Sequence, residues 1–261
     1  MRFNDIKSSV RGFMSLYTPS GNEREYEIIA STLKSDERKN VRTLGESVDK
    51  KLSGYRAEVE RVKKLYAFDK SYGYQCVAGV DEVGRGPLAG PIVAAAVILD
   101  EDFENIILGI NDSKKLSHEV REELSEIIKE KAISYSIAVK DNNEIDSRGI
   151  GFCNNQVFKE AVEGLKVTPD MVLSDGYTIK EFDLENKAVI KGDTKSAAIA
   201  CASIIAKVYR DRLMVDYSSE YTHYGFEKNV GYGTKEHIEA IKNFGKCPIH
   251  RETFIKNILI K

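Results

Sequence analysis

The spacing of apolar residues changes character near residue 75. Before that point, apolar side chains recur at helical spacing in two stretches, one from Val41 to Leu52 and one from Tyr55 to Tyr66. Side chains three and four positions apart lie on one face of a helix. The pattern therefore predicts two amphipathic helices, followed by a linker at Phe68 to Gln75, where the periodicity stops.

From Cys76 onward the apolar residues come in short runs that are typical of buried strands. The runs are Cys76 to Val80, Ile92 to Leu99, Ala132 to Val139, Met171 to Leu173 and, more weakly, Ala188 to Ile190. Three helical segments lie among them, at Ser117 to Lys131, Gly151 to Leu165 and Ser196 to Met214. This order predicts an α/β domain built on a mixed sheet. Small residues on several faces of the last helix predict close packing against that sheet.

The charge is distributed unevenly along the 261 residues. The whole chain has a formal net charge of -2, but residues 1–72 carry 15 basic and 11 acidic side chains. We therefore expect two parts, a basic helical N-terminal extension at 1–72 and a larger domain at 73–261. Such an extension could grip nucleic acid or bind a partner protein, and the sequence leaves both open.

No segment suggests export or membrane insertion. The longest apolar stretch, Ala89 to Leu99, is interrupted by Gly90 and Pro91, and it is shorter than the roughly 20 residues of a membrane span. Residues 1–16 carry charged side chains and no apolar core segment, so we expect no secretory signal. The sequence predicts a cytoplasmic monomer without membrane contact, and it identifies no protein partner.

Cysteine and histidine do not form a metal-binding pattern. The four cysteines include no Cys-x-x-Cys pair, and no two of the four histidines are spaced by two, three or four residues. A zinc site usually shows such spacing. We therefore expect reduced, structural cysteines, and we expect any chemistry to reside in carboxylates.

Two adjacent acids, Asp81 and Glu82, directly follow the apolar run that ends at Val80. Consecutive strand residues face opposite ways, so both can serve one site only if the strand ends there. Gly84 and Gly86 supply that break. Alternatively, Glu82 is simply solvated at a strand end. The glycine spacing fits neither a dinucleotide-binding nor a P-loop motif.

Two further acids have a similar context. Asp175 follows the run Met171 to Leu173, and Asp193 follows the run Ala188 to Ile190. Taken singly, Asp175 could be a turn residue before glycine, and Asp193 could cap the next helix. Together with Asp81 and Glu82, they predict a cluster for a hard cation, because Mg²⁺ and Mn²⁺ prefer oxygen ligands.

The segment Asp81 to Pro91 resembles the signature of bacterial ribonuclease HII. Further matching motifs follow in the same order: Asp112-Ser113-Lys114-Lys115-Leu116, Ser174-Asp175-Gly176, Gly192-Asp193-Thr194-Lys195-Ser196, Ala202-Ser203-Ile204-Ile205-Ala206-Lys207, Gly231-Tyr232-Gly233-Thr234-Lys235-Glu236-His237 and Pro248-Ile249-His250-Arg251. The resemblance covers about residues 75–255. The related ribonuclease HIII typically lacks the Gly84-Arg85-Gly86 loop, and residues 1–72 resemble the N-terminal extension of some bacterial members only loosely.

This resemblance implies a ribonuclease H-like fold, in which a mixed β-sheet is flanked by helices. It implies that Asp81, Glu82, Asp175 and Asp193 hold two divalent ions, Mg²⁺ or Mn²⁺, and that hydrolysis leaves a 5′-phosphate and a 3′-hydroxyl. The implied substrate is an RNA–DNA hybrid or duplex DNA with an embedded ribonucleotide. The implied role is ribonucleotide excision in DNA replication and repair.

The resemblance also assigns substrate recognition. In the family, the loop that matches Gly84-Arg85-Gly86 and a tyrosine that matches Tyr232 recognise the ribose-to-deoxyribose junction. The 2′-hydroxyl is exposed in the shallow minor groove of an A-like duplex, where the backbone of glycines can approach it. The flanking Gly231 and Gly233 favour an exposed Tyr232 over a packed aromatic ring.

Several basic residues are candidates for phosphate contacts, although a lysine on a charged helix is more often simply solvated. They are Lys114, Lys115, Lys195, Lys207, Arg210 and Arg212.

Two other functions stay open. Another two-metal nuclease of the same fold would cleave DNA, but the Gly84-Arg85-Gly86 loop together with Tyr232 argues against it. A non-catalytic hybrid-binding protein would use the four acids structurally, and the presence of all four argues against that function.

Overall fold

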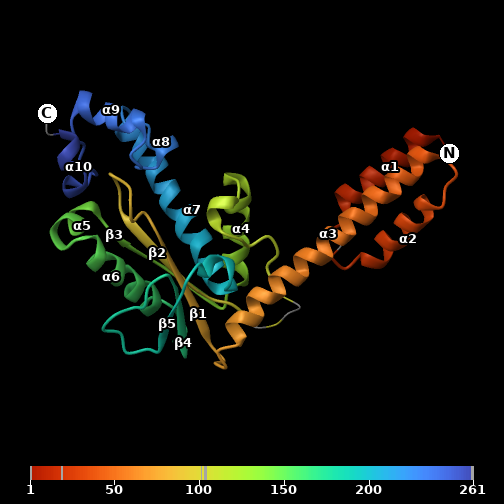
Figure 1. Ribbon diagram of the computed structural model, residues 1–261, viewed down its shortest axis with the longest axis horizontal. Coiled ribbons are helices and arrows are strands. Elements are labelled where there is room, and N and C mark those ends of the chain that lie inside the picture. Colours follow the sequence, from red (N-terminus) through yellow and green to blue (C-terminus); the bar gives the residue numbers. More distant parts are fainter. Residues whose placement is uncertain (1, 19, 101, 103–104, 260–261) are drawn as a thin grey trace. The chain divides into compact units, whose positions relative to one another are not determined.

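The computed structural model describes residues 2–18, 20–100, 102 and 105–259. The chain divides into two compact units, Met1–Arg61 and Val62–Lys261, which are labelled by element in Figure 1. Among the described residues, no helix has the combination of length and hydrophobicity that a membrane span requires.

The N-terminal unit consists of α1 (Phe3–Leu16), α2 (Glu23–Lys34) and the first part of α3 (Lys39–Lys70). The two helices predicted in this region are one helix, α3. Leu52 and Tyr55 are three positions apart, which is again a helical spacing, so the two apolar series form one continuous stripe along a single helix. The sequence pattern did not single out α1 and α2, which share a buried core with α3: Val10, Tyr26, Ala30, Leu33, Val41, Val48 and Leu52.

The larger unit is built on a five-stranded mixed sheet in the order β3-β2-β1-β4-β5, and the predicted fold class is confirmed. The strands are β1 (Val77–Val83), β2 (Ile92–Ile98), β3 (Ser134–Lys140), β4 (Met171–Asp175) and β5 (Asn186–Val189). β2 pairs antiparallel with β1 and β3, while β4 pairs parallel with β1 and β5. The carboxyl ends of β1, β4 and β5 therefore meet at one edge of the sheet.

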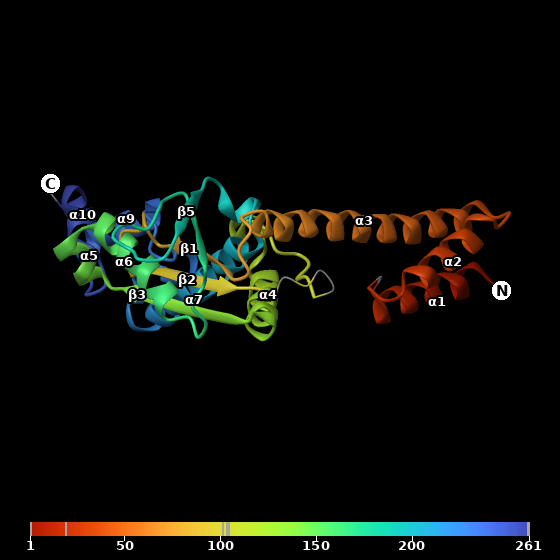
Figure 2. The ribbon, with the colours of Figure 1, turned by 90° about the horizontal axis from the view of Figure 1, so that it is seen from below.

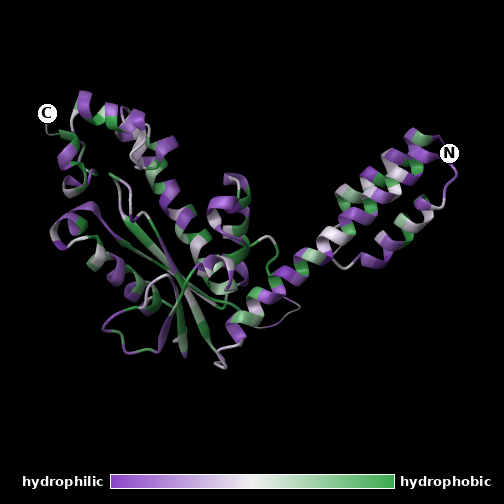
Figure 3. Cartoon of the chain, in the orientation of Figure 1, coloured by the Kyte–Doolittle hydropathy of each residue, from purple (hydrophilic) through white to green (hydrophobic). Residues whose placement is uncertain are grey.

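Helices cover both faces of this sheet (Figure 1). One face packs against α7 (Ala197–Glu220) and α4 (His118–Lys131), and the other packs against α5 (Asn142–Arg148) and α6 (Ile150–Glu163). In Figure 3 the central strands are largely green, whereas α4 carries bands of both colours.

The predicted close approach of α7 to the sheet is confirmed at Gly79. A Cβ on Gly79 would lie 2.2 Å from the carbonyl carbon of Ala198, closer than any side chain can pack.

The remaining elements of this unit are short. They are the 3₁₀ turns η1 (Ser113–Lys115) and η2 (Gly192–Thr194) and the helices α8 (Phe226–Asn229), α9 (Lys235–Phe244) and α10 (Glu252–Leu259). Figure 2 shows α9 and α10 from below.

The predicted linker is wrong in its first part, because α3 continues to Lys70. Phe68, Tyr72 and Tyr74 pack against a buried cluster that includes Leu173 of β4. Aromatic burial therefore orders a segment that lacks periodicity.

Candidate active site

Asp81 and Glu82 lie inside β1, so the predicted strand end at this point is wrong. They pair with Ala95 and Ala94 of β2, and β1 continues to Val83. The backbone of β1 pairs with the fully buried strand β2 through both acids, and this pairing does not depend on the side chains of Asp81 and Glu82.

Both carboxylates still reach one cavity because β4 is the shorter strand. The pairing of Val80 with Ser174 places Asp175, the last residue of β4, beside Asp81. Glu82 therefore lies beyond the end of the neighbouring strand, where no residue of β4 covers it.

The fourth carboxylate follows β5. Asp175 Oδ1 accepts a hydrogen bond of 2.6 Å from the backbone N–H of Gly192, the residue just before Asp193 in η2. The alternative that Asp193 caps the next helix is wrong. The N-cap of α7 is Ser196, whose side chain accepts from the N–H of Ile199.

A cavity of about 420 Å³ brings the four predicted carboxylates together. Its lining residues are Asp81, Glu82, Val83, Ser113, Lys114, Asp175, Asp193, Ser203, Lys207 and Tyr232. Two predicted phosphate ligands, Lys115 and Lys195, are exposed on the surface and do not line it.

Burial, and after it the proximity of like charges, raises the pKa values of three of these carboxylates. Burial, and next the charge of Glu82, raise the pKa of Asp81 well above its usual range. Burial, with a further contribution from Asp175 and against the opposing charge of Arg85, raises the pKa of Glu82 to about 7. Burial, and next Asp175, also raise the pKa of Asp193. These carboxylates repel one another unless a cation neutralises them.

The donor set fits hard divalent cations, because carboxylate oxygens are the ligands that Mg²⁺ and Mn²⁺ prefer. Within the described part of the chain, no three Asp, Glu, His or Cys side chains are placed to hold a single metal ion. Mg²⁺ usually keeps several waters and needs only one or two protein carboxylates. Four carboxylates around one cavity are therefore enough for two such ions.

Two buried serines support the central carboxylate, and no sequence pattern predicted their role. The hydroxyls of Ser113 and Ser203 lie 3.0 Å apart, and a hydrogen bond from Ser203 lowers the pKa of Asp81 against the effect of burial. Both serines occur within the motifs that match the family, which is the signal that could have identified them.

The glycine loop, Gly84 to Pro91, is held from the interior by two arginines. Arg210 and Arg251 are fully buried. Arg210 donates to the carbonyl oxygens of Ala89, Pro91 and Val230, and Arg251 donates to those of Gly84, Arg85 and Gly90. The prediction that Arg210 contacts phosphate is therefore wrong, because all three nitrogens of its buried guanidinium donate hydrogen bonds to backbone carbonyl oxygens.

Two other basic candidates are engaged by carboxylates. Lys207 lines the cavity and lies 2.8 Å from Asp211. Arg212 pairs with Glu122 and does not line the cavity. Of the six candidates, only Lys114 and Lys207 therefore face the carboxylates.

The glycines of the loop differ in their surroundings. Gly84 has a φ of +92°, and a Cβ there would lie 2.2 Å from Arg210 Nε, so packing alone requires glycine. Gly86 is exposed, and a Cβ there would meet nothing within 4 Å. Of these two glycines, Gly86 is thus the one open to an approaching ligand. Between them, Arg85 lies over the ring of Tyr177, 4.4 Å from its centroid.

Tyr232 is 41% exposed and lines the cavity. The preceding Gly231 has a φ of +86°, and a Cβ there would lie 2.4 Å from the carbonyl oxygen of Ala89. The same Gly231 accepts a hydrogen bond from Leu88 N–H at 2.8 Å. The turn that carries Tyr232 is therefore packed directly on the glycine loop.

Comparison with known proteins agrees with these observations. The family model described as ribonuclease HII matches residues 78–257, and the model of the ribonuclease HII N-terminal domain matches residues 20–73. The ribonuclease HII of Clostridium perfringens strain 13 is 64% identical over 240 residues, which are 91% of this chain and 88% of the relative. The ribonuclease HII of Clostridium acetobutylicum is 54% identical and covers 99% of this chain and 100% of its own.

The fold also matches a solved structure. The ribonuclease H2 from Pyrococcus horikoshii OT3 superimposes with a TM-score of 0.60 at 28% identity. The match covers 70% of this chain and 97% of that one.

Proposed function

The chain belongs to the ribonuclease HII family of hydrolases, and on that basis we propose that it is a metal-dependent endoribonuclease. It cleaves the RNA strand of RNA–DNA hybrids and cuts on the 5′ side of ribonucleotides embedded in duplex DNA, leaving a 5′-phosphate and a 3′-hydroxyl. The observation that carries this proposal is the convergence of Asp81, Glu82, Asp175 and Asp193 on one cavity beside Tyr232.

The four carboxylates would hold two divalent ions, Mg²⁺ or Mn²⁺. Bound there, such ions would acidify an attacking water and stabilise the leaving 3′ oxygen. Asp81 is oriented through Ser203, and the hydrogen bond from Gly192 N–H orients Asp175. Hydrogen bonds from the protein itself thus orient two of the four carboxylates, Asp81 and Asp175.

Substrate contacts divide between phosphate and sugar. Lys114 and Lys207 face the cavity and would contact phosphates beside the scissile bond. The exposed backbone at Gly86 and the ring of Tyr232 would approach the 2′-hydroxyl and the sugar of the junction, which lie in the shallow minor groove. Arg85 would complete the loop that reads this junction.

We assign residues 1–72 to an auxiliary helical extension that grips duplex phosphates, and the rest to the catalytic domain. Exposed basic side chains of the extension, among them Arg11, Arg24 and Lys50, support this role. The protein would act as a cytoplasmic monomer in ribonucleotide excision.

A cleavage assay on a labelled RNA–DNA hybrid tests the catalytic part. Wild-type protein should cut with Mg²⁺ or Mn²⁺ and stop when a chelator is added. Asp175→Asn should bind the hybrid and not cut it, because it loses a charge that holds the ions. Binding without cleavage by the wild type, even with Mn²⁺, would instead identify a non-catalytic hybrid-binding protein.

A further inference from the structure

Two buried histidines outside the carboxylate cavity form a directional link to Tyr232. We propose that His237 and His250, both neutral, act as positioning residues that fix the backbone of Tyr232 relative to the glycine loop. This inference rests on the proposed role of the Tyr232 ring in substrate reading.

The hydrogen bonds allow one assignment of protons. The backbone N–H of Cys247 lies 2.9 Å from His250 Nδ1, and a backbone N–H can only donate, so Nδ1 is an acceptor. The proton of neutral His250 is then on Nε2, which lies 3.0 Å from His237 Nε2. That atom accepts, so the proton of His237 is on Nδ1 and is donated to the carbonyl oxygen of Tyr232 at 2.9 Å.

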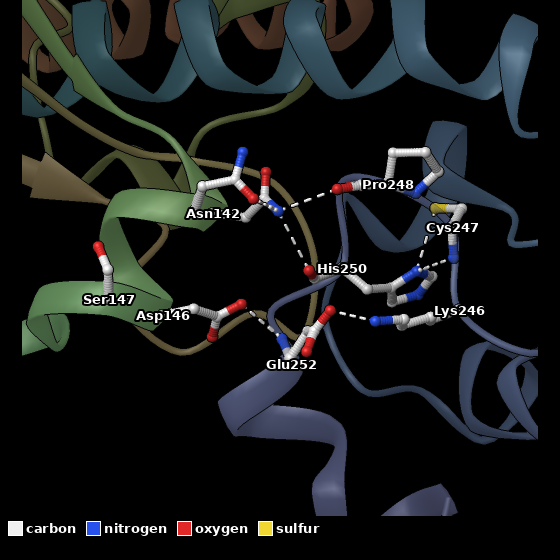
Figure 4. A pocket seen from close by; sticks show the side chains of 9 residues that line it. Asn142, Asp146, Ser147, Lys246, Cys247, Pro248, His250 and Glu252 are labelled. Atoms are coloured by element: carbon white, nitrogen blue, oxygen red, sulfur yellow. Dashed lines mark hydrogen bonds and ion pairs between the residues drawn. The ribbon is translucent and has the colours of Figure 1, made fainter.

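At its other end, at His250, this series of hydrogen bonds is attached to the glycine loop. The carbonyl oxygen of Ile249, the residue before His250, accepts a hydrogen bond from the N–H of Gly90 at 2.8 Å. Arg251, the residue after His250, donates its N–H to the carbonyl oxygen of Leu88. Figure 4 shows that Asn142 of α5 bonds the carbonyl oxygens of Pro248 and His250 from the other side. The histidine pair therefore connects a fixed backbone to the Tyr232 turn.

The surroundings keep both imidazoles uncharged. His237 and His250 are 0% and 1% exposed, and burial lowers the pKa of each, that of His250 to about 4. The aromatic rings of Tyr224 and Phe226 pack against the pair. The titratable or charged groups around it are the Cys247 thiol, the Tyr224 phenol, Arg251 and, lining the cavity beside His250, Asp146, Lys246 and Glu252.

Protonation of either ring is incompatible with this arrangement. A second proton on His250 would point from Nδ1 at the Cys247 N–H, and a second proton on His237 would point at the Nε2 proton of His250. Each case sets two donors against each other inside a buried site, which costs at least one hydrogen bond. The link to Tyr232 therefore holds only while both histidines are neutral.

The first test reads the tautomers directly. Long-range proton–nitrogen correlation NMR of the ¹⁵N-histidine-labelled full chain at neutral pH should show His237 as the neutral Nδ1–H form and His250 as the neutral Nε2–H form. Only four histidines are present, and the signals lost in His118→Gln, His223→Gln and His237→Asn assign all four, including which of the two buried rings gives which signal. The reverse tautomers, or a charged ring at neutral pH, would overturn the proposal.

The second test reports the position of residue 232 without using catalysis. The chain contains no tryptophan, so Tyr232→Trp supplies a single fluorescent reporter on this turn. In that background, His237→Leu removes the donor to the carbonyl of residue 232, whereas His237→Asn keeps an amide donor near the position of Nδ1. The indole anisotropy should fall with His237→Leu and stay high with His237→Asn. Equal anisotropy in both would contradict the proposal.

Cleavage supplies the functional readout in the chain that keeps Tyr232. His237→Leu should lower kcat/KM on an embedded ribonucleotide about tenfold or more, because a small misplacement of a positioning group is costly. His237→Asn should recover most of that loss. Equal losses in the two variants would overturn the positioning role. If the wild type does not cleave while the tautomers and the anisotropy behave as expected, the proposed function fails and the link stands.

Discussion

Arg251 is fully buried, and its Nη2 donates a hydrogen bond of 2.6 Å to the carbonyl oxygen of Gly84. Its other partners are also carbonyl oxygens, and burial, with the charge of Arg210 next, lowers the pKa of Arg251 to about 9. The guanidinium remains the donor that fixes the shape of the glycine loop from the interior. The shape of the glycine loop is thus determined by hydrogen bonds made inside the core.

Arg251→Lys should destabilise the protein by about 3 kcal/mol. An ammonium cannot reach all three carbonyls at once, so buried acceptors lose their donors. Urea unfolding measures the difference. Arg212→Lys, at an exposed arginine paired with Glu122, is the matched control and should stay within about 0.5 kcal/mol of wild type. Similar losses in both variants would refute the interior role of Arg251.

Asp193→Asn should abolish most activity and leave the melting temperature almost unchanged. Asp193 does not cap α7, so the substitution should remove only the charge that the proposed function assigns to cation binding, and cleavage should fall about a hundredfold or more. Ser196→Ala should do the reverse and cost about 1 kcal/mol of stability through the lost cap. Thermal melts and initial rates separate the two effects, and near-normal cleavage by Asp193→Asn would remove it from the metal site.

Tyr232→Phe should keep most activity, whereas Tyr232→Ala should lose much of it, because the ring face matters more than the hydroxyl. Stacking in nucleic-acid binders is worth about 1–3 kcal/mol, which corresponds to roughly five- to 150-fold in rate. The loss should be larger on a single embedded ribonucleotide than on a long hybrid. Equal losses on both substrates would mean that the ring packs the wall of the cavity and does not read the junction.

Duplex binding should weaken if the extension contacts phosphate and three of its exposed basic residues are neutralised together, in the combined variant Arg11→Gln, Arg24→Gln and Lys50→Gln. Each lost contact lowers the salt slope of the logarithm of the binding constant by about 0.9. Binding titrations at several salt concentrations measure the slope, with cleavage chemistry suppressed by a chelator. An unchanged slope would assign the extension to protein binding or to structure.

The stability of the protein should fall in mild acid because of His250. Its pKa is about 4 in the fold and about 6.5 in an unfolded chain, so the unfolded state binds more protons between these values. Stability is then complete above about pH 6.5 and decreases towards pH 4, by at most about 3 kcal/mol. Urea titrations at several pH values should show a shallower fall in His250→Asn than in the exposed control His223→Asn. Identical slopes would exclude His250 as the source.

The sequence was sufficient for the sheet and for the four carboxylates. Apolar runs identify buried strands, and the acids that follow three of these runs could be predicted to gather in one site. The end of β1 could not, because β2 pairs with Asp81 and Glu82 through the backbone alone. The capping role of Ser196 was missed because Asp193, three residues earlier, offers the same chemistry.

The interior polar network could not be predicted. The sequence indicates that Arg210 is a surface residue of a charged helix, but its burial depends on carbonyls from two separate segments, Ala89 and Pro91 of the glycine loop and Val230. His237 and His250 are thirteen residues apart, a spacing that indicates no contact. Such groups are identified only when the fold brings distant backbone acceptors and donors together.

The most direct test of the account compares two duplexes of the same sequence, one all DNA and one with a single ribonucleotide. Both are incubated with the protein in Mg²⁺ and, separately, in Mn²⁺, and the products are mapped with end-labelled strands. The account predicts one cut on the 5′ side of the ribonucleotide, with 5′-phosphate and 3′-hydroxyl ends, and no cut in the all-DNA duplex. Equal cleavage of both duplexes would contradict it and would identify a DNA nuclease of the same fold.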